Sequence, residues 1–262
     1  MKSLLLTPLE NIDSQEVFLY KQLRENHFAT DNSFIADSPK VVNEILKTSL
    51  DLKSILATQE YYQEHEALLT SQEGLKCYVA SKEQMEGIIG HKIHHNCMLH
   101  GIRPKENKLE EMGDGIIMLD AITSTENLGS IARSAAALGV DSLILSKHSP
   151  HPYARRSLRV SMGHISKLKY HIYEDIFATI KKLQALGYSV IAAEVSKDAQ
   201  ALSEIKIPKK WVLLMGHEGH GLSDEVIQAC DATVLIEMAE GIKSLNVAVA
   251  SSILMYTFVK KR

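Results

Sequence analysis

Cysteine is scarce in this sequence, and long apolar runs are absent. Its three cysteines, Cys77, Cys97 and Cys230, are scattered and odd in number. They show neither a disulfide framework nor CxxC spacing, which indicates a reducing compartment. No window approaches the roughly 20 apolar residues of a membrane span, and the apolar run in MKSLLLTPLE is too short for a signal peptide. We therefore expect a cytoplasmic protein without a membrane partner.

An excess of positive charge is also missing, since the formal net charge is −3. This argues against a protein that coats nucleic acid without specificity. Acidic residues are nevertheless absent between Asp141 and Glu174, a stretch that is rich in lysine, arginine and histidine. Phosphate binding explains this asymmetry, because cations release counterions from nucleic acid; a solvated basic face is the alternative. The candidate RNA-binding residues are Arg155, Arg156 and Arg159.

The chain of 262 residues, 45% hydrophobic and 23% charged, has ordinary globular composition and is long enough for two domains. Its first part mixes the hydrophobic patterns of helices and of strands. We expect helices over residues 11–26, from Pro39 onward and over 82–89, and strands over 34–36, 54–57 and 76–80. The polar segment 103–108 contains a proline and is the expected linker.

Beyond the linker, strands and helices alternate. The strands are expected at residues 115–120, 142–145, 188–195, 211–215 and 233–238, and the helices at 128–138, 176–186, 223–230 and 244–258. Alternation of this kind predicts a parallel sheet with helices on both faces.

Two segments of this second part follow strands and open helices. In the first, Asn127 suits a helix N-cap, Gly129 allows close backbone approach, and Arg133 lies off the apolar stripe. In the second, the glycines of Gly216-His217-Glu218-Gly219-His220-Gly221 let backbone amides face a ligand, and Ser223 caps the next helix. The spacing is neither that of a dinucleotide loop nor that of a P-loop. Read alone, each segment could also be a simple turn into a capped helix.

A third segment, Ser244-Leu245-Asn246-Val247, leads into the last helix. Ser244 is the expected cap. Asn246 is a poor helix former inside a first turn, so a polar contact to a ligand would explain its presence.

In this order the three segments resemble the SpoU family of TrmH-like RNA ribose methyltransferases, within the SPOUT class. The matching residues are Asn127, Gly129 and Arg133, then Gly216, Glu218, Gly219, Gly221, Leu222 and Ser223, then Ser244 to Val247. The resemblance covers about residues 113–262. A weaker one covers the front part, which looks like the ribosomal-protein-like RNA-binding domain of many members.

The resemblance implies a fold: an α/β parallel sheet flanked by helices with a C-terminal trefoil knot, preceded by a smaller α/β RNA-binding domain. The boundaries implied are residues 1–105 for the putatively substrate-binding part and 106–262 for the methyltransferase domain. It also implies a homodimer that transfers a methyl group from S-adenosylmethionine to a ribose 2′-hydroxyl of structured RNA, rRNA or tRNA.

By carry-over, the cofactor-binding residues are Leu214, Met215, Gly216, Ile236, Met238 and Leu245, and the catalytic group comprises Arg133, Asn127, Glu218, Ser244 and Asn246. Arg133 is the family's candidate for activating the hydroxyl. A guanidinium is effectively always protonated. We therefore interpret Arg133 as holding the ribose and its phosphate while stabilising the developing alkoxide, rather than as a base.

One departure concerns Glu237, which stands where the family usually has proline. Proline fixes φ and withholds an amide at that point. We expect the Glu237 carboxylate to avoid the adenosine and to reach solvent or a cation such as Lys243. The departure is the only support for an alternative function, an inactive RNA-binding protein that keeps the scaffold. A small-molecule methyltransferase is disfavoured by the basic stretch and the front domain.

A histidine-rich segment, with His91, His94, His95 and His100 around Cys97, raises the question of zinc. The spacing matches no common structural zinc pattern, and the segment has the character of a turn followed by a strand. We expect a polar domain surface there and no metal site.

Overall fold

The computed structural model describes residues 4–21 and 32–261, which form two compact units. The first takes its described residues from Met1–Lys105 and Tyr153–Ser166, and the second from Glu106–Pro152 and Lys167–Arg262. The first boundary between the two units, after Lys105, lies within the segment 103–108, which contains no helix or strand. The segment Tyr153–Ser166 was assigned to the second domain from sequence, yet it belongs to the first unit.

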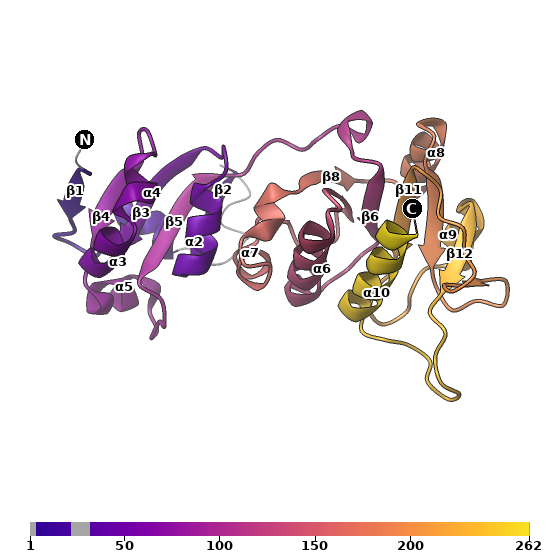
Figure 1. Ribbon diagram of the computed structural model, residues 1–262. Coiled ribbons are helices and arrows are strands. Elements are labelled where there is room, and N and C mark those ends of the chain that lie inside the picture. Colours follow the sequence, from indigo (N-terminus) through magenta and orange to yellow (C-terminus); the bar gives the residue numbers. More distant parts are fainter. Residues whose placement is uncertain (1–3, 22–31, 262) are drawn as a thin grey trace. The chain divides into compact units, whose positions relative to one another are not determined.

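The first unit contains a five-stranded mixed sheet in the order β1-β4-β3-β5-β2 (Figure 1). The strands are β1 (Leu6–Pro8), β2 (Ser33–Asp37), β3 (Leu52–Ala57), β4 (Lys76–Val79) and β5 (Cys97–Ile102). β5 runs antiparallel to its neighbours β2 and β3, whereas the β1–β4 and β3–β4 pairs are parallel. The helices of this unit are α1 (Phe18–Lys21), α2 (Pro39–Leu46), α3 (Gln59–Glu64), α4 (Glu66–Thr70), α5 (Lys82–Ile89) and α7 (Arg155–Val160).

Most elements expected in this unit are confirmed, including the helix that starts at Pro39. The helix expected over 11–26 is instead a 3-10 turn, Gln15–Val17, followed by α1, and residues 22–26 lie outside the described residues. The short helices α3, α4 and α7 were missed, because five or six residues carry too little periodicity to recognise.

Helix α7 is anchored in the first unit by contacts on both sides. It packs against β2. Just before it, the ring of Tyr153 lies 5.2 Å from that of Phe34. Just after it, Gly163 adopts a φ of +83°, and a Cβ there would lie 3.0 Å from the Val41 carbonyl oxygen. Glycine is required at this turn for both reasons.

The second unit contains a seven-stranded sheet in the order β10-β12-β9-β11-β6-β7-β8. The strands are β6 (Gly115–Leu119), β7 (Ser142–Ser146), β8 (Lys169–Tyr173), β9 (Ser189–Ala193), β10 (Gln200–Ala201), β11 (Trp211–Met215) and β12 (Ala232–Leu235). Every pairing in it is parallel, which confirms the parallel sheet. The helices are α6 (Thr125–Leu138), α8 (Ile176–Ala185), α9 (Asp224–Ala229) and α10 (Val247–Lys260).

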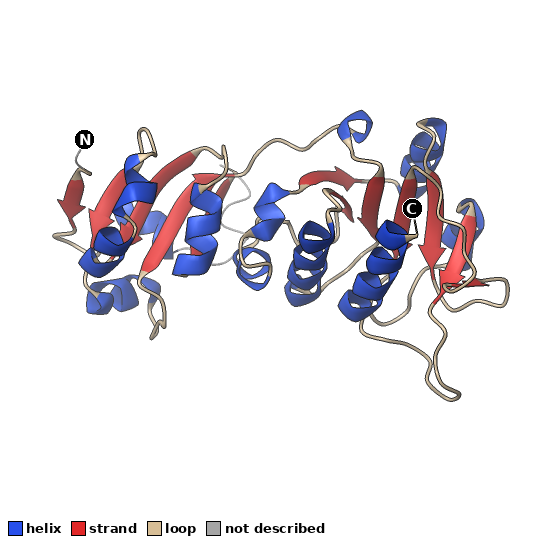
Figure 2. Ribbon diagram, viewed as in Figure 1, coloured by secondary structure: helices blue, strands red, loops and turns tan. Residues whose placement is uncertain are grey.

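Helices cover both faces of this sheet (Figure 2). Side chains alternate along a strand, so neighbours in β11 point to opposite faces. Val212 and Leu214 join the core cluster under α8 and α9. Trp211 faces the other way, and its ring lies 5.1 Å from that of Phe258 in α10. Within the described ranges, no helix is long and apolar enough to cross a lipid bilayer.

Among the element ends that differ from expectation, three lie beside the candidate motifs. α6 begins at Thr125, because Ser124 rather than Asn127 is its N-cap. β12 ends at Leu235, so Glu237 is not in a strand. α10 begins at Val247, and its N-cap is Asn246 rather than Ser244. In each helix the N-cap is the residue whose side-chain oxygen accepts a free amide of the first turn.

Candidate active site

A cavity of about 450 Å³ opens in the second unit beyond the carboxyl ends of β9, β11 and β12. Ligands of open α/β sheets bind at this edge, and the volume is that of a small-molecule site. Its walls come from the ends of these strands, the glycine-rich loop and the segment before α10. The lining residues used below are Asn127, Glu194, Met215, Gly216, His217, Glu218, His220, Ile236, Met238, Lys243, Ser244, Leu245 and Asn246.

The glycine-rich loop is a tight turn closed on itself. The amide of Gly221 donates to the carbonyl of His217 at 2.9 Å, and the amide of His217 donates back at 3.2 Å. A Cβ on Gly216 would lie 2.3 Å from the Gly221 carbonyl carbon. Gly221 has a φ of +66°, and a Cβ there would lie 2.2 Å from a carboxylate oxygen of Glu194. The two glycines are thus demanded by close approach of backbone and carboxylate.

The Glu218 carboxylate ties this loop to the start of α6. It accepts hydrogen bonds from the backbone amides of Thr123 and Ser124, each at 3.1 Å, and from Asn127 Nδ2 at 3.0 Å. Burial raises the pKa of Glu218, but these donors outweigh burial and lower the pKa to about 2. Glu218 therefore stays ionised and acts as an acceptor only.

Asn246 connects the third motif to the other two. Its Nδ2 donates to Asn127 Oδ1 at 3.1 Å, while its Oδ1 accepts the amides of Ala248 and Val249 at the start of α10. Glu218, Asn127 and Asn246 therefore form one chain of hydrogen bonds across three motifs. A polar contact to a ligand was expected for Asn246; within the protein its side chain caps α10 and bonds to Asn127.

Five of the six residues predicted to bind the cofactor line the cavity, namely Met215, Gly216, Ile236, Met238 and Leu245. The side chain of Leu214 does not. It is fully buried in the core cluster under α8 and α9, because alternation along β11 turns it away from the face of Met215.

Four of the five predicted catalytic residues also line the cavity: Asn127, Glu218, Ser244 and Asn246. Arg133 does not line it. Arg133 is exposed on α6, and its guanidinium bonds to no other described residue. Its position leaves the side chain available to an external anion.

Sequence reasoning missed several polar residues of the cavity. Glu194 lies directly after β9, and its carboxylate accepts the amides of Leu222 and Val195, each at 3.0 Å. An acidic residue at the end of an expected buried strand was the available signal. His217 and His220 also line the cavity, and their rings stack with centroids 3.9 Å apart.

Glu237 lies outside the cavity lining. Its carboxylate accepts hydrogen bonds from the hydroxyl and the amide of Ser203, and the hydroxyl bond lowers the pKa of Glu237. Its partner is therefore Ser203 and not Lys243. The strand expected over 233–238 was wrong at its end, because β12 stops at Leu235 and Glu237 follows it.

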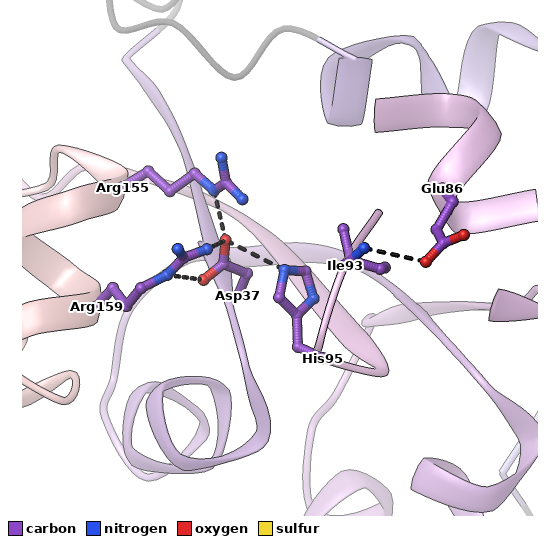
Figure 3. A network of polar contacts seen from close by, with 6 residues as sticks. All are labelled: Asp37, Glu86, Ile93, His95, Arg155 and Arg159. Atoms are coloured by element: carbon purple, nitrogen blue, oxygen red, sulfur yellow. Dashed lines mark hydrogen bonds and ion pairs between the residues drawn. The ribbon is translucent and has the colours of Figure 1, made fainter. Parts of the chain in front are cut away.

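Two of the three candidate RNA-binding arginines share one carboxylate of the first unit. Arg155 and Arg159 bond to the buried carboxylate of Asp37, with His95 also beside it (Figure 3). Arg156 is exposed. Of the other histidines near Cys97, His100 lies 2.9 Å from the Ser33 hydroxyl. No group of three potential metal ligands occurs among the described residues.

The parallel sheet with a cavity at its carboxyl edge defines an α/β protein with a small-molecule site, and comparisons with known proteins identify the family. Residues 114–256 match the model of the SpoU rRNA Methylase family. An uncharacterized tRNA/rRNA methyltransferase of Mycobacterium bovis is 31% identical over 189 residues, which cover 70% of this chain and 66% of that protein.

Two solved structures are similar over nearly the whole chain. An rRNA methyltransferase from Sinorhizobium meliloti, solved with AdoMet bound, has a TM-score of 0.83 at 21% identity, covering 97% of this chain and 98% of its own. An RNA 2′-O ribose methyltransferase has a TM-score of 0.78 at 19% identity, covering 98% and 99%. The chain belongs to the SpoU rRNA methylase family, a family of RNA methyltransferases.

Proposed function

We propose that this protein transfers a methyl group from S-adenosylmethionine to a ribose 2′-hydroxyl of structured RNA, with rRNA favoured over tRNA. The observation that carries this proposal is the pair of hydrogen bonds that links Glu218, Asn127 and Asn246, and so joins the three motifs around one cavity. The likeness to an rRNA methyltransferase and to an RNA 2′-O ribose methyltransferase supports it.

The cavity suits the proposed cofactor. Met215, Ile236 and Leu245 supply apolar surface for a purine, and the loop at Gly216 supplies backbone groups without side-chain obstruction. Bound there, S-adenosylmethionine would supply a methyl group already activated by a sulfonium. The protein's task is then to position the ribose oxygen, deal with its proton and hold the phosphate.

Arg133 is proposed to hold the ribose and its phosphate and to stabilise the alkoxide as it forms. It is exposed and carries no partner among the residues described. The hydrogen-bonded chain from Glu218 through Asn127 fixes the start of α6, the helix that carries Arg133. Ser244 lies at the rim of the same cavity and is proposed to orient the substrate.

We also propose the homodimer, the trefoil knot and the cytoplasmic location implied by the family resemblance. Three apolar side chains of α10, Val249, Ile253 and Tyr256, are exposed at spacings of four and three residues, which puts them on one helix face. Such an exposed stripe favours burial against a second copy. The front unit is proposed to bind the RNA substrate.

Calorimetry and methylation mapping test the proposal together. We expect S-adenosylmethionine to bind in the micromolar range, at about −7 to −8 kcal/mol. Ribose-methylation mapping of rRNA and tRNA from a deletion strain should reveal one lost 2′-O-methyl group. Methylation of a base would refute the ribose chemistry. Absence of heat at millimolar cofactor would favour the inactive scaffold. The position of Glu237 outside the cavity lining speaks against that alternative.

A further inference from the structure

The carboxylate of Asp37, at the end of β2, is completely inaccessible to solvent. It accepts hydrogen bonds from Arg155 Nε and from Nε and Nη2 of Arg159, and His95 Nε2 lies 3.6 Å away (Figure 3). Burial raises the pKa of Asp37, but the bond from Arg159 and the two arginine charges outweigh burial and keep the pKa below its usual value. A buried charge is costly unless it is paired in this way.

Both arginines reach the protein surface from this buried partner. The side chain of Arg155 is 20% exposed and that of Arg159 is 46% exposed. Asp37 occupies only one edge of each guanidinium. Both terminal nitrogens of Arg155 and Nη1 of Arg159 bond to no acceptor within residues 4–21 and 32–261. A guanidinium held at one edge can still bind a phosphate through the other.

The charge balance of this cluster favours an anion. Burial lowers the pKa of His95 despite the attraction of Asp37, so its imidazole stays neutral at pH 7. Two arginines and one aspartate leave a net charge of about +1. The arginines lie in the stretch between Asp141 and Glu174, which contains no acidic residue. This stretch therefore supplies no carboxylate that would compete with a phosphate for the two arginines.

We propose that Arg155 and Arg159 form a phosphate clamp for the RNA backbone, and that Asp37 is the positioning residue that orders both guanidiniums before RNA binds. The inference rests on the proposed RNA substrate. Ordering long side chains in the free protein removes an entropy cost from binding. Because Asp37 neutralises one charge, the clamp contributes about one released counterion and not two.

The test measures binding of a fluorescently labelled RNA stem–loop by full-length protein as a function of potassium chloride. Asp37→Asn removes the neutralising charge, so the log–log salt slope should steepen by about 0.9. Affinity extrapolated to 1 M salt should fall roughly tenfold, because the arginines are no longer ordered. Asp51→Asn is the matched control: its carboxylate pairs with Lys53, is largely exposed and lies in the same unit. It should change neither quantity.

A second variant keeps the charges and the pairing. Arg155→Lys combined with Arg159→Lys retains two cations beside Asp37 but loses the planar fork that binds phosphate. Affinity should fall roughly tenfold at an unchanged slope.

The outcomes separate the two levels of the proposal. Folded variants that bind RNA as the wild type does would make the cluster an ion pair that only fixes α7 to β2, and would overturn the clamp alone. Wild-type protein that binds S-adenosylmethionine but no RNA at any salt concentration would overturn the proposed substrate, and the clamp with it. Circular dichroism of each variant verifies its fold.

Discussion

Replacing Glu218 by glutamine would test whether one carboxylate holds the glycine-rich loop against the start of α6. Glutamine keeps the size of the side chain and one acceptor oxygen. That oxygen can still accept from Ser124 and Asn127, on the side of Oε1. The new amide would then face the Thr123 amide, which now donates to Oε2 at 3.1 Å, so two donors would oppose each other.

The expected loss follows from the hydrogen bonds and from the lowered pKa. A shift from an ordinary value to about 2 corresponds, for a shielded group, to roughly 3 kcal/mol. Glu218 is exposed, so solvent screening reduces this contribution. We expect a loss of about 1–2 kcal/mol in the free energy of unfolding, which lowers the melting temperature of a unit of this size by roughly 2–6 °C.

Fluorescence of Trp211 offers a specific assay. Trp211 is the only tryptophan of the chain and is buried in β11, so its signal reports on the second unit alone. The folded pKa of Glu218 is lowered, so its stabilising effect is present above the ordinary value of about 4.3 and is lost as the pH falls toward about 2.

The difference between wild type and Glu218→Gln should therefore be full at pH 7 and clearly smaller at pH 3. Glu240→Gln serves as the control, because Glu240 is exposed in the same unit and has no partner among the residues described. A difference below about 0.3 kcal/mol at pH 7, or an equal difference at both pH values, would refute the reasoning.

Three further predictions concern the cavity and its surroundings. Arg133→Ala should leave the Kd for S-adenosylmethionine within about twofold, while methyl transfer falls on the order of 100-fold; loss of cofactor binding in a folded variant would contradict the proposed role of Arg133. Gly221→Ala should weaken cofactor binding at least roughly tenfold, because the φ of Gly221 is +66° and a Cβ there would strike Glu194. Gly219→Ala is the control, because a Cβ at Gly219 would have its nearest neighbours at 3.5 Å. Equal effects of the two changes on the cofactor Kd in calorimetry would refute the steric argument. Glu237→Gln should leave methyl transfer unchanged because Glu237 bonds to Ser203, and Glu237→Pro should bind the cofactor equally well or better by less than about 1 kcal/mol; loss of methylation at unchanged affinity in Glu237→Gln would make Glu237 a catalytic group.

The parallel sheet was predictable because its strands are almost continuously apolar. Trp211–Met215 is buried at every position, and strands covered on both faces have this character. Glycines and capping residues then marked the ends of the strands. The three motifs could be singled out as candidate site segments because two of them follow such strands and because, in this order, they resemble the SpoU motifs.

The partners within the site were not predictable from local pattern. Asn127 has the right chemistry for an N-cap, but Ser124 occupies that role and frees Asn127 to bond with Glu218 and Asn246. These bonds join residues 91 and 119 positions apart, and no periodicity encodes such a pairing. The basic stretch posed the same difficulty, because a cation with a buried carboxylate partner has the same sequence pattern as a solvated one.

Because α7 lies between β7 and β8 in the chain but packs in the first unit, the polypeptide passes between the units near residues 105, 152 and 166. The units are therefore not interchangeable modules of contiguous sequence. A chimera joined at Lys105 would combine the front unit of this chain with the α7 of another protein. Unless that helix offered two matching arginines, Asp37 would be left as an unpaired buried charge, at a cost of roughly 3–5 kcal/mol. Recombination that moves the front unit of this chain must therefore transfer Tyr153–Ser166 together with it.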